Sequence, residues 1–97
     1  MRIISRNTLR EFWEKHPDSS QQLQTWYMDV KHAQWKKPSD IKLTYQNASF
    51  LADNRVVFNI KGNKYRVIVV IEHKSKAVYI RFVGTHQEYD RINAETI

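Results

Sequence analysis

The sequence contains no cysteine, only two glycines and two prolines, and no long hydrophobic run. Without cysteine there are no disulfide bridges, thiolate zinc sites, iron–sulfur clusters or cysteine nucleophiles. A membrane-spanning helix needs about 20 apolar residues, and no stretch of this chain approaches half that length. The first residues lack the apolar run of a secretory signal, so we expect a cytoplasmic protein. We expect a single domain over residues 1–97, because one hydrophobic core accounts for a chain of this length.

Basic residues outnumber acidic ones by 16 to 10, and the excess is concentrated in one third of the chain. Residues 54–87 carry a net charge of +6, whereas residues 1–53 carry +2 and residues 88–97 carry −2. The basic side chains of the middle segment alternate with apolar ones, which is typical of a folded surface rather than a disordered tail. Such a surface favours a polyanionic partner. The alternative is that the lysines only protect a sheet edge from aggregation.

The first half of the chain predicts two amphipathic helices joined by a tight turn. Pro17 ends the first helix, and Asp18, Ser19 or Ser20 begins the second. The apolar positions at helical spacing are Leu9, Phe12, Trp13 and His16, followed by Leu23, Trp26, Tyr27 and Val30. The three tryptophans at positions 13, 26 and 35 could stack on nucleic-acid bases, but their spacing favours a place in the core. Residues 38–54 are irregular, apart from a possible helical turn at 39–46.

From Arg55 onward the apolar period changes to two, which predicts three antiparallel strands. Gly62-Asn63 tolerates the positive φ angles of a tight hairpin turn, and a turn centred there pairs Asn59 with Arg66. A second turn centred at Lys74-Ser75 pairs Val70 with Tyr79 and Ile68 with Arg81. One sheet face is then apolar and packs on the helices. The other is open and carries Val57, Asn59, Arg66, Ile68, Val70, Glu72, Tyr79, Arg81 and Val83.

The fold class that follows is α+β, with two N-terminal helices packed on one face of a small, mainly antiparallel sheet. Residues 2–4 add an edge strand, which makes the order β-α-α-β-β-β. Thr85 and Glu88 have the spacing of a capping box, so a short C-terminal helix begins with His86 and carries Tyr89 one turn later. Both side chains would lie at the end of the strand that carries Arg81.

Two arginines, an asparagine, a histidine and a tyrosine on a basic sheet are suited to phosphodiester cleavage. Arginine binds phosphate bidentately and stabilises the charge of a pentacovalent transition state. Histidine and tyrosine transfer protons, and the 2′-hydroxyl of RNA serves as the nucleophile, so that no metal and no cofactor are needed. The four histidines are scattered and lack a carboxylate cluster, which argues against a metal site. The chain has no P-loop, dinucleotide-binding or nucleophile-elbow motif.

Two segments, FNIKGNKYR at residues 58–66 and THQEYD at residues 85–90, resemble the HigB-type toxins of bacterial toxin–antitoxin systems. The similarity extends in order over the two leading helices and the Lys36-Lys37-Pro38 connection. It implies a RelE-like fold and an mRNA endonuclease that acts on the translating ribosome, in its A site. It also implies neutralisation by a cognate HigA-type helix-turn-helix antitoxin. No membrane partner is expected.

The resemblance maps family positions onto Asn63, Arg66, Arg81, His86 and Tyr89. It implies that Arg66 and Arg81 bind the scissile phosphate, that His86 transfers a proton, and that Tyr89 transfers a proton or stacks on a base. It further implies that the following residues bind RNA: Asn59, Lys61, Asn63 and Lys64. Asp90 orients His86 or lies near the helix start without a role in the chemistry.

Two other functions remain open from the sequence. A basic RNA-binding module would use the same sheet without cleaving RNA and would block translation by occupancy. A sheet that binds single strands by stacking should expose several aromatic rings, and the open face offers only Tyr79. A protein that merely receives an acidic partner is the third reading, and an antitoxin would serve as such a partner.

Overall fold

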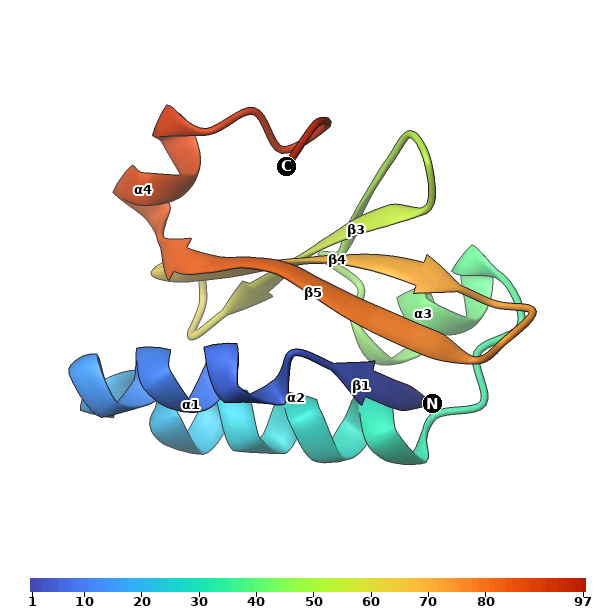
Figure 1. The fold of residues 1–97 in the computed structure, drawn as a ribbon, viewed down its shortest axis with the longest axis horizontal. Helices are drawn as coiled ribbons and strands as arrows, with labels where there is room; N and C mark the ends of the chain where they lie inside the picture. Colours follow the sequence, from blue (N-terminus) through green and yellow to red (C-terminus); the bar gives the residue numbers. More distant parts are fainter.

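A computed structural model describes residues 1–97 as a five-stranded sheet with helices on both sides (Figure 1). The elements are β1 (Arg2–Ile4), α1 (Arg6–Lys15), the 3₁₀ turn η1 (Pro17–Ser19), α2 (Ser20–His32), α3 (Pro38–Thr44), β2 (Ser49–Leu51), β3 (Arg55–Ile60), β4 (Tyr65–Glu72), β5 (Ala77–Thr85) and α4 (His86–Arg91). The predicted α+β class and the two leading helices are confirmed. No helix is both long enough and apolar enough to span a membrane.

The strand order is β1-β5-β4-β3-β2, and all neighbours are antiparallel except β1, which runs parallel to β5. The predicted edge strand at residues 2–4 is therefore present. β2 was not expected from the sequence, because its three residues have no readable alternation. The predicted helical turn at 39–46 corresponds to α3, which Pro38 begins at a position where a missing N–H is tolerated.

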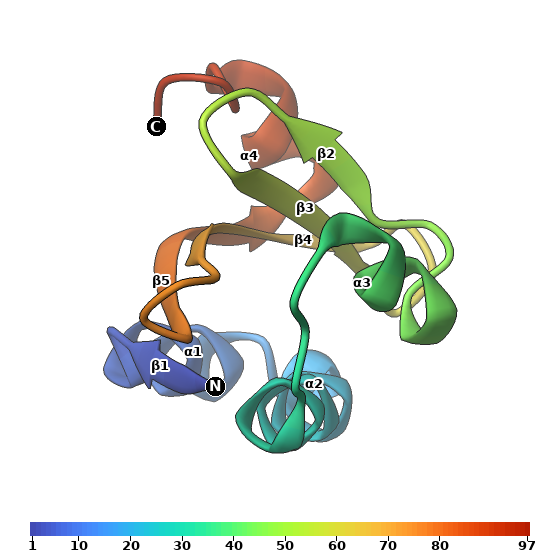
Figure 2. The same ribbon diagram turned by 90° about the vertical axis from the view of Figure 1, so that its right-hand side faces the viewer.

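The helices α1 and α2 cover one face of the sheet, and Figure 2 shows them as a layer below β4 and β5. Sixteen buried residues form the core on this side, and Trp26 and Trp35 are among them. Trp13 is partly buried and packs against the same cluster. The tryptophans are thus core residues, as predicted, and do not form a base-stacking surface.

Phe58 of β3 lies at the centre of this core and is 1% exposed. Its ring centroid lies 5.3 Å from those of Trp26 and Tyr45 and 6.2 Å from that of Trp35. The hydroxyl of Tyr45 donates to Asp29 of α2 at 2.6 Å, which ties the end of α3 to that helix. Burial and the Asp29 carboxylate together raise the pKa of Tyr45. One aromatic ring therefore joins β3, α2 and the segment around α3.

The opposite face, which we call the second face, is not open as the sequence suggested. Val57 and Ile68 are cross-strand partners on it and are 2% and 0% exposed. Figure 1 shows α4 and the C-terminal segment lying over this side of the sheet. The prediction of a solvent-facing surface was wrong because no pattern in the sequence indicates that the last twelve residues fold back over the strands.

A β-bulge in β5 also changes which residues face this side. Val70 pairs with Tyr79 as predicted, but Ile68 pairs with Phe82 and not with Arg81. Arg81 is the additional residue, so the alternation reverses beyond it. Phe82 consequently lies on the second face with Ile68, and Val83 packs against the core. Bulges leave no signature in an alternating sequence, which is why the predicted register failed here.

We predict that Phe58→Ala destabilises the protein by about 3–5 kcal/mol, because it leaves a cavity among three aromatic rings. The matched control is Leu43→Ala, since Leu43 is 83% exposed and should change stability by no more than about 0.5 kcal/mol. Urea unfolding of both variants measures the difference. Equal losses in the two variants would contradict the central position of Phe58.

Candidate active site

The β3–β4 hairpin loop, residues 61–64, positions the candidate site. Asn59 pairs with Arg66 as predicted, and Ile60 pairs with Tyr65 to close the loop. Positive φ angles occur at Lys61 and Gly62, with φ 53° and 64°. The loop therefore turns one residue earlier than predicted, and Asn63 does not adopt a positive φ. The correct register came from the sequence even though the turn itself has four residues and not two.

Asp18 of η1 binds this loop from the helical side. Its carboxylate accepts hydrogen bonds from the Lys64 ammonium and the Tyr65 hydroxyl, both at 2.5 Å, and lies 3.5 Å from the Lys61 ammonium. These partners, Lys64 first, hold the pKa of Asp18 far below its ordinary value. The same hydrogen bond raises the pKa of Lys64. The loop is thus fastened to the turn between α1 and α2.

Arg66 is buried although it lies on the second face, with only 9% of its surface exposed. Its Nη1 donates to the main-chain oxygen of Asn63 at 2.7 Å and to that of Tyr65 at 3.3 Å. Its guanidinium carbon lies 5.4 Å from the centre of the Tyr89 ring, a cation–π distance. The expectation that Arg66 lies on an open face was therefore wrong. Its guanidinium is held in place between the hairpin loop and α4.

The start of α4 is attached to the same loop. The predicted capping box is present: the amide of Glu88 donates to Thr85 Oγ1 at 3.1 Å, and the amide of Thr85 donates to Glu88 Oε1 at 2.8 Å. These bonds lower the pKa of Glu88. The amide of His86 donates to the main-chain oxygen of Lys64 at 2.9 Å. Two adjacent carbonyls of the loop therefore accept hydrogen bonds. The Asn63 carbonyl accepts from the Arg66 guanidinium, and the Lys64 carbonyl accepts from the His86 amide.

His86 is half-exposed, and its Nδ1 lies 3.2 Å from Oδ2 of Asp90, one turn further along α4. A carboxylate on one imidazole nitrogen fixes the ring orientation and leaves the other nitrogen for a substrate. This arrangement agrees with the first of the two predictions made for Asp90. It is the arrangement needed for a histidine that takes up or delivers a proton.

A cleft of about 650 Å³ opens beside the hairpin loop, between the end of α1 and the start of α4. Ten residues line it: Lys15, His16, Pro17, Asp18, Asn63, Lys64, Tyr65, Thr85, His86 and Gln87. Three predicted site residues, Asn63, Lys64 and His86, therefore face one cavity. Arg66 and Tyr89 lie next to it through the contacts described above, and Lys61 belongs to the same loop.

The remaining predicted site residues lie elsewhere. The residue opposite Arg66 on β5 is Gly84, so Arg81 lies three residues from the position that faces Arg66 and not two, as the predicted pairing of Ile68 with Arg81 would give. Three residues along a strand correspond to about 10 Å. Arg81 instead donates from Nε to the main-chain oxygen of Ile97 at 3.3 Å. Asn59 lines a different hollow with Gln21, Thr25 and Tyr45, on the side of α2.

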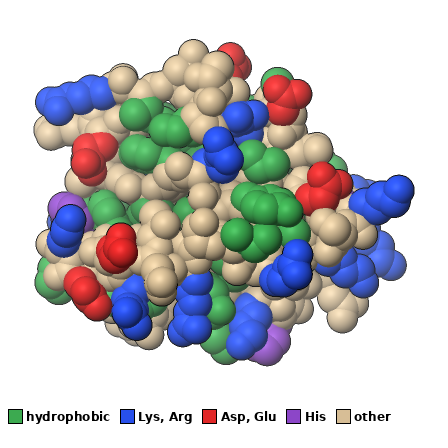
Figure 3. Space-filling view, viewed as in Figure 1, with side chains coloured by type: hydrophobic (Ala, Val, Ile, Leu, Met, Phe, Trp, Pro, Cys, Tyr) green, Lys and Arg blue, Asp and Glu red, His purple; other side chains and the backbone are tan.

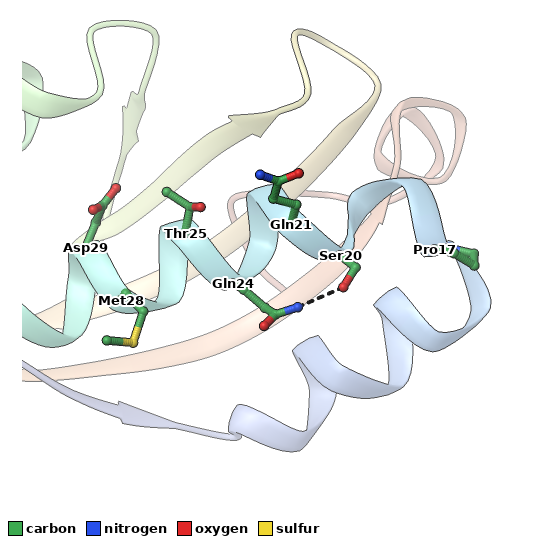
Figure 4. A pocket seen from close by; sticks show the side chains of 7 residues that line it. All are labelled: Pro17, Ser20, Gln21, Gln24, Thr25, Met28 and Asp29. Atoms are coloured by element: carbon green, nitrogen blue, oxygen red, sulfur yellow. Dashed lines mark hydrogen bonds between the residues drawn. The ribbon is translucent and has the colours of Figure 1, made fainter.

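A separate hollow runs along the outer side of α2, and Figure 4 shows the side chains that line it. Gln24 donates to Ser20 there at 2.8 Å, and its one charged group, Asp29, already accepts the Tyr45 hydroxyl. None of the predicted site residues lines it. It has no cationic side chain and its one charge is negative, which is unfavourable for a phosphate, so we place the candidate site at the hairpin cleft.

The basic residues do not merge into one continuous patch. In Figure 3, lysine and arginine side chains are spread across the visible face with acidic and hydrophobic areas between them. Lys61 and Lys64 share Asp18, so part of the positive charge of the middle segment is already paired. The structure contains no group of three or more His, Cys, Asp or Glu side chains placed to hold a metal ion.

Sequence reasoning missed two residues that organise this region, Asp18 and Arg55. Asp18 was considered only as a helix cap, but it makes no such bond, and Ser19 Oγ instead donates to the His16 carbonyl at 2.7 Å. For Arg55 the sequence indicates only one charge of the basic segment. Both contact partners more than 40 residues away in the chain, and a single sequence contains no signal for such pairings.

We predict that Asp18→Asn removes a pH-dependent part of the stability. The folded-state pKa of Asp18 is lowered, so its ion pairs stabilise the fold above about pH 4 and are lost as the pH falls below that value. Urea midpoints should therefore fall less between pH 7 and pH 3 in this variant than in the wild type. Asp53→Asn, at an exposed position, is the control and should show the wild-type decrease. Identical pH profiles for all three proteins would contradict the ion-pair assignment.

Comparisons with known proteins show the family of the chain. Residues 19–92 match the family model of the HigB toxin, described as the RelE-like toxic component of a toxin-antitoxin system. The mRNA interferase toxin HigB of Escherichia coli K12 is 33% identical over 97 residues, which cover 97% of this chain and 92% of the relative. The mRNA interferase HigB of Escherichia coli O6:H1 is 28% identical over 94 residues, covering 95% and 91%. The chain therefore belongs to the HigB family of RelE-like toxins of toxin–antitoxin systems.

Proposed function

We propose that the protein is an mRNA interferase, an endoribonuclease that cleaves mRNA on the translating ribosome in the cytoplasm. The observation that carries the proposal is the attachment of Arg66 and His86 to adjacent carbonyls of one loop, beside an open cleft. This attachment supports a phosphate-binding role for Arg66 and a proton-transfer role for His86 in one site. The names of the relatives, mRNA interferases, support the same activity.

The chemistry needs no group from outside the chain and its RNA. The 2′-oxygen of the nucleotide attacks its own 3′-phosphate, the P–O5′ bond breaks, and the products are a 2′,3′-cyclic phosphate and a 5′-hydroxyl end. One proton leaves the 2′-hydroxyl and one arrives on the departing 5′-oxygen. Arg66 stabilises the charge on the phosphorane oxygens. His86, oriented by Asp90, carries one of the two proton transfers.

Arg66 suits the scissile phosphate because its position is already fixed. Its contacts with Asn63 and Tyr65 use Nη1 alone, so the other guanidinium nitrogens make no hydrogen bond within the chain. A preorganised donor spends no free energy on reorganising during the reaction. Lys61, Asn63 and Lys64 then bind the RNA backbone from the loop, and Asn59 contacts it from the far side of β3. Arg81 is also a phosphate ligand, but the bulge moves it to a neighbouring phosphate.

Two partners follow from the family. A toxin of this kind is paired with an antitoxin, and we propose a HigA-type helix-turn-helix protein in that role. The ribosomal A site would present the mRNA to the hairpin cleft in an extended form. The paired lysines support a need for the ribosome, because a surface whose cations are partly neutralised by Asp18 binds free RNA less strongly.

We predict that His86→Ala lowers mRNA cleavage about 10²- to 10⁴-fold, the usual loss for a general acid or base, with little change in RNA affinity. The experiment induces the variants in a bacterial host at matched expression and maps new mRNA 5′ ends genome-wide. His32→Ala is the control, because His32 is exposed on α2 away from the cleft.

The wild type and the control should produce new ends confined to translated regions, and a transcript without a start codon should be spared. Cleavage by His86→Ala at the wild-type rate would exclude His86 from the chemistry. Growth arrest by the wild type without new ends would favour the non-catalytic RNA-binding module instead.

A second pair of variants separates proton transfer by the Tyr89 hydroxyl from a role of the Tyr89 ring. Tyr89→Phe keeps the ring over Arg66 and removes only the hydroxyl, whereas Tyr89→Leu removes the ring as well. If the hydroxyl transfers a proton, Tyr89→Phe should reduce the cleavage rate as strongly as Tyr89→Leu. We predict that Phe retains cleavage within about threefold and that Leu loses at least tenfold, because the cation–π contact positions Arg66. Cleavage rates on programmed ribosomes measure this, and equal loss in both variants would assign Tyr89 to proton transfer.

A further inference from the structure

Two arginines from different strands converge on one oxygen atom above the second face. Arg55, at the start of β3, donates from Nε and Nη2 to the main-chain oxygen of Ile97 at 3.2 and 2.9 Å. Arg81, in the bulge of β5, donates from Nε to the same atom at 3.3 Å. The strand β4 lies between them, so their side chains approach each other across it. The bulge leaves Arg81 without a cross-strand partner and places its side chain in this position.

This arrangement is favourable only when an acceptor lies between the two cations. Two guanidinium groups that approach each other repel, and the Ile97 oxygen that both of them contact offsets this repulsion. Arg55 also contacts the carboxylate of Asp53, whose Oδ2 lies 3.9 Å from Nη1. The Asp53 side chain is 85% exposed, so this ion pair contributes little stability. A phosphate presents several oxygen atoms and binds arginine pairs bidentately. The pair therefore has the geometry and the charge for a phosphate group.

The segment that now fills this position makes few hydrogen bonds to the sheet. The hydrogen bonds within residues 92–97 are local: the amides of Thr96 and Ile97 donate to the Asn93 carbonyl, and the amide of Glu95 donates to the Asn93 side chain. The hydrogen bonds that connect this segment to the sheet are those from Arg55 and Arg81. Figure 1 shows it crossing back from α4 over the strands. A ligand that binds both arginines would release it without breaking any pairing of the sheet.

We propose that Arg55 and Arg81 form a second phosphate-binding subsite, which holds an RNA backbone phosphate next to the scissile one. In the free protein, residues 92–97 occupy this subsite through the Ile97 oxygen, and RNA displaces them. The subsite rests on the proposed function for the identity of its ligand. Arg66 is opposite Gly84 on β5, about 10 Å along the strand from Arg81, so one extended RNA strand can contact both positions.

The test measures binding of the full-length protein to a single-stranded 2′-O-methyl RNA oligonucleotide, which cannot be cleaved because its 2′-oxygens are blocked. We expect Arg55→Gln to weaken binding about tenfold at low salt, the usual effect of losing one charge-assisted hydrogen-bonding group. It should also reduce the slope of log K against log salt by about 0.7, the value for one phosphate contact on a single strand. Arg10→Gln removes the same charge from an exposed position on α1 and is the control, with the wild-type slope.

Amide NMR signals of residues 93–97 provide a second readout. They should shift when the oligonucleotide is added to the wild type, because the segment leaves the sheet. An unchanged salt slope in Arg55→Gln, or a loss of thermal stability alone, would show that Arg55 only anchors the segment and would overturn the subsite. Failure of the proposed function can be distinguished from failure of the subsite. If the wild type makes no new mRNA ends in cells but Arg55→Gln still alters the salt slope, the protein binds RNA phosphate without cleaving it.

Discussion

The hairpin loop at residues 61–64 is the constraint on which the candidate site depends. Its main chain accepts the Arg66 guanidinium at Asn63 and the His86 amide at Lys64. Its lysines and the neighbouring Tyr65 hydroxyl meet Asp18 at the end of the first helix. Three parts of the chain, around residues 18, 63 and 86, are therefore brought together by one short turn. Tyr65 is the member of this set whose ring also lies in the hydrophobic core, so it links the polar contacts of the site to the core packing.

The bulge at Arg81 moves this arginine farther from Arg66 than a regular strand would place it. In a regular register, Arg81 would lie opposite Ile68 and nearer to Arg66, and two cations would share one region. The bulge places Gly84 opposite Arg66, and a side chain at Gly84 would collide with the Phe82 ring, whose nearest atom lies 2.4 Å from the Cβ position. Phe82 therefore lies over Gly84 and covers the second face, while Arg81 points to Arg55. The extra residue in β5 thus sets both the packing of this face and the spacing of its arginines.

Much of this architecture could be predicted from the sequence, and the failures have one physical cause. Helical spacing located α1 and α2, and the capping box located α4, because these features depend on residues within one or two turns. The register of β3 against β4 followed from Gly62-Asn63, although the positive φ angles fall at Lys61 and Gly62. What could not be predicted depends on distant partners. Tertiary packing determines the bulge in β5 and the short strand β2. It also determines the contacts of Asp18 with the hairpin loop and the hydrogen bonds from Arg55 to Ile97.

The same distinction explains why the net charge of +6 is a poor guide to where RNA binds. Lys61 and Lys64 share Asp18, and Arg55 and Arg81 share the Ile97 oxygen, so four cations of the basic segment already have an acceptor within the protein. A phosphate that replaces such an acceptor gains only the difference between the two interactions, not the full attraction. Binding to free RNA is therefore an exchange of partners and is weakened accordingly. Under the proposed function, the ribosome holds the mRNA in an extended form and so provides part of the ordering that binding requires. We therefore expect cleavage to depend on translation more strongly than the net charge alone indicates.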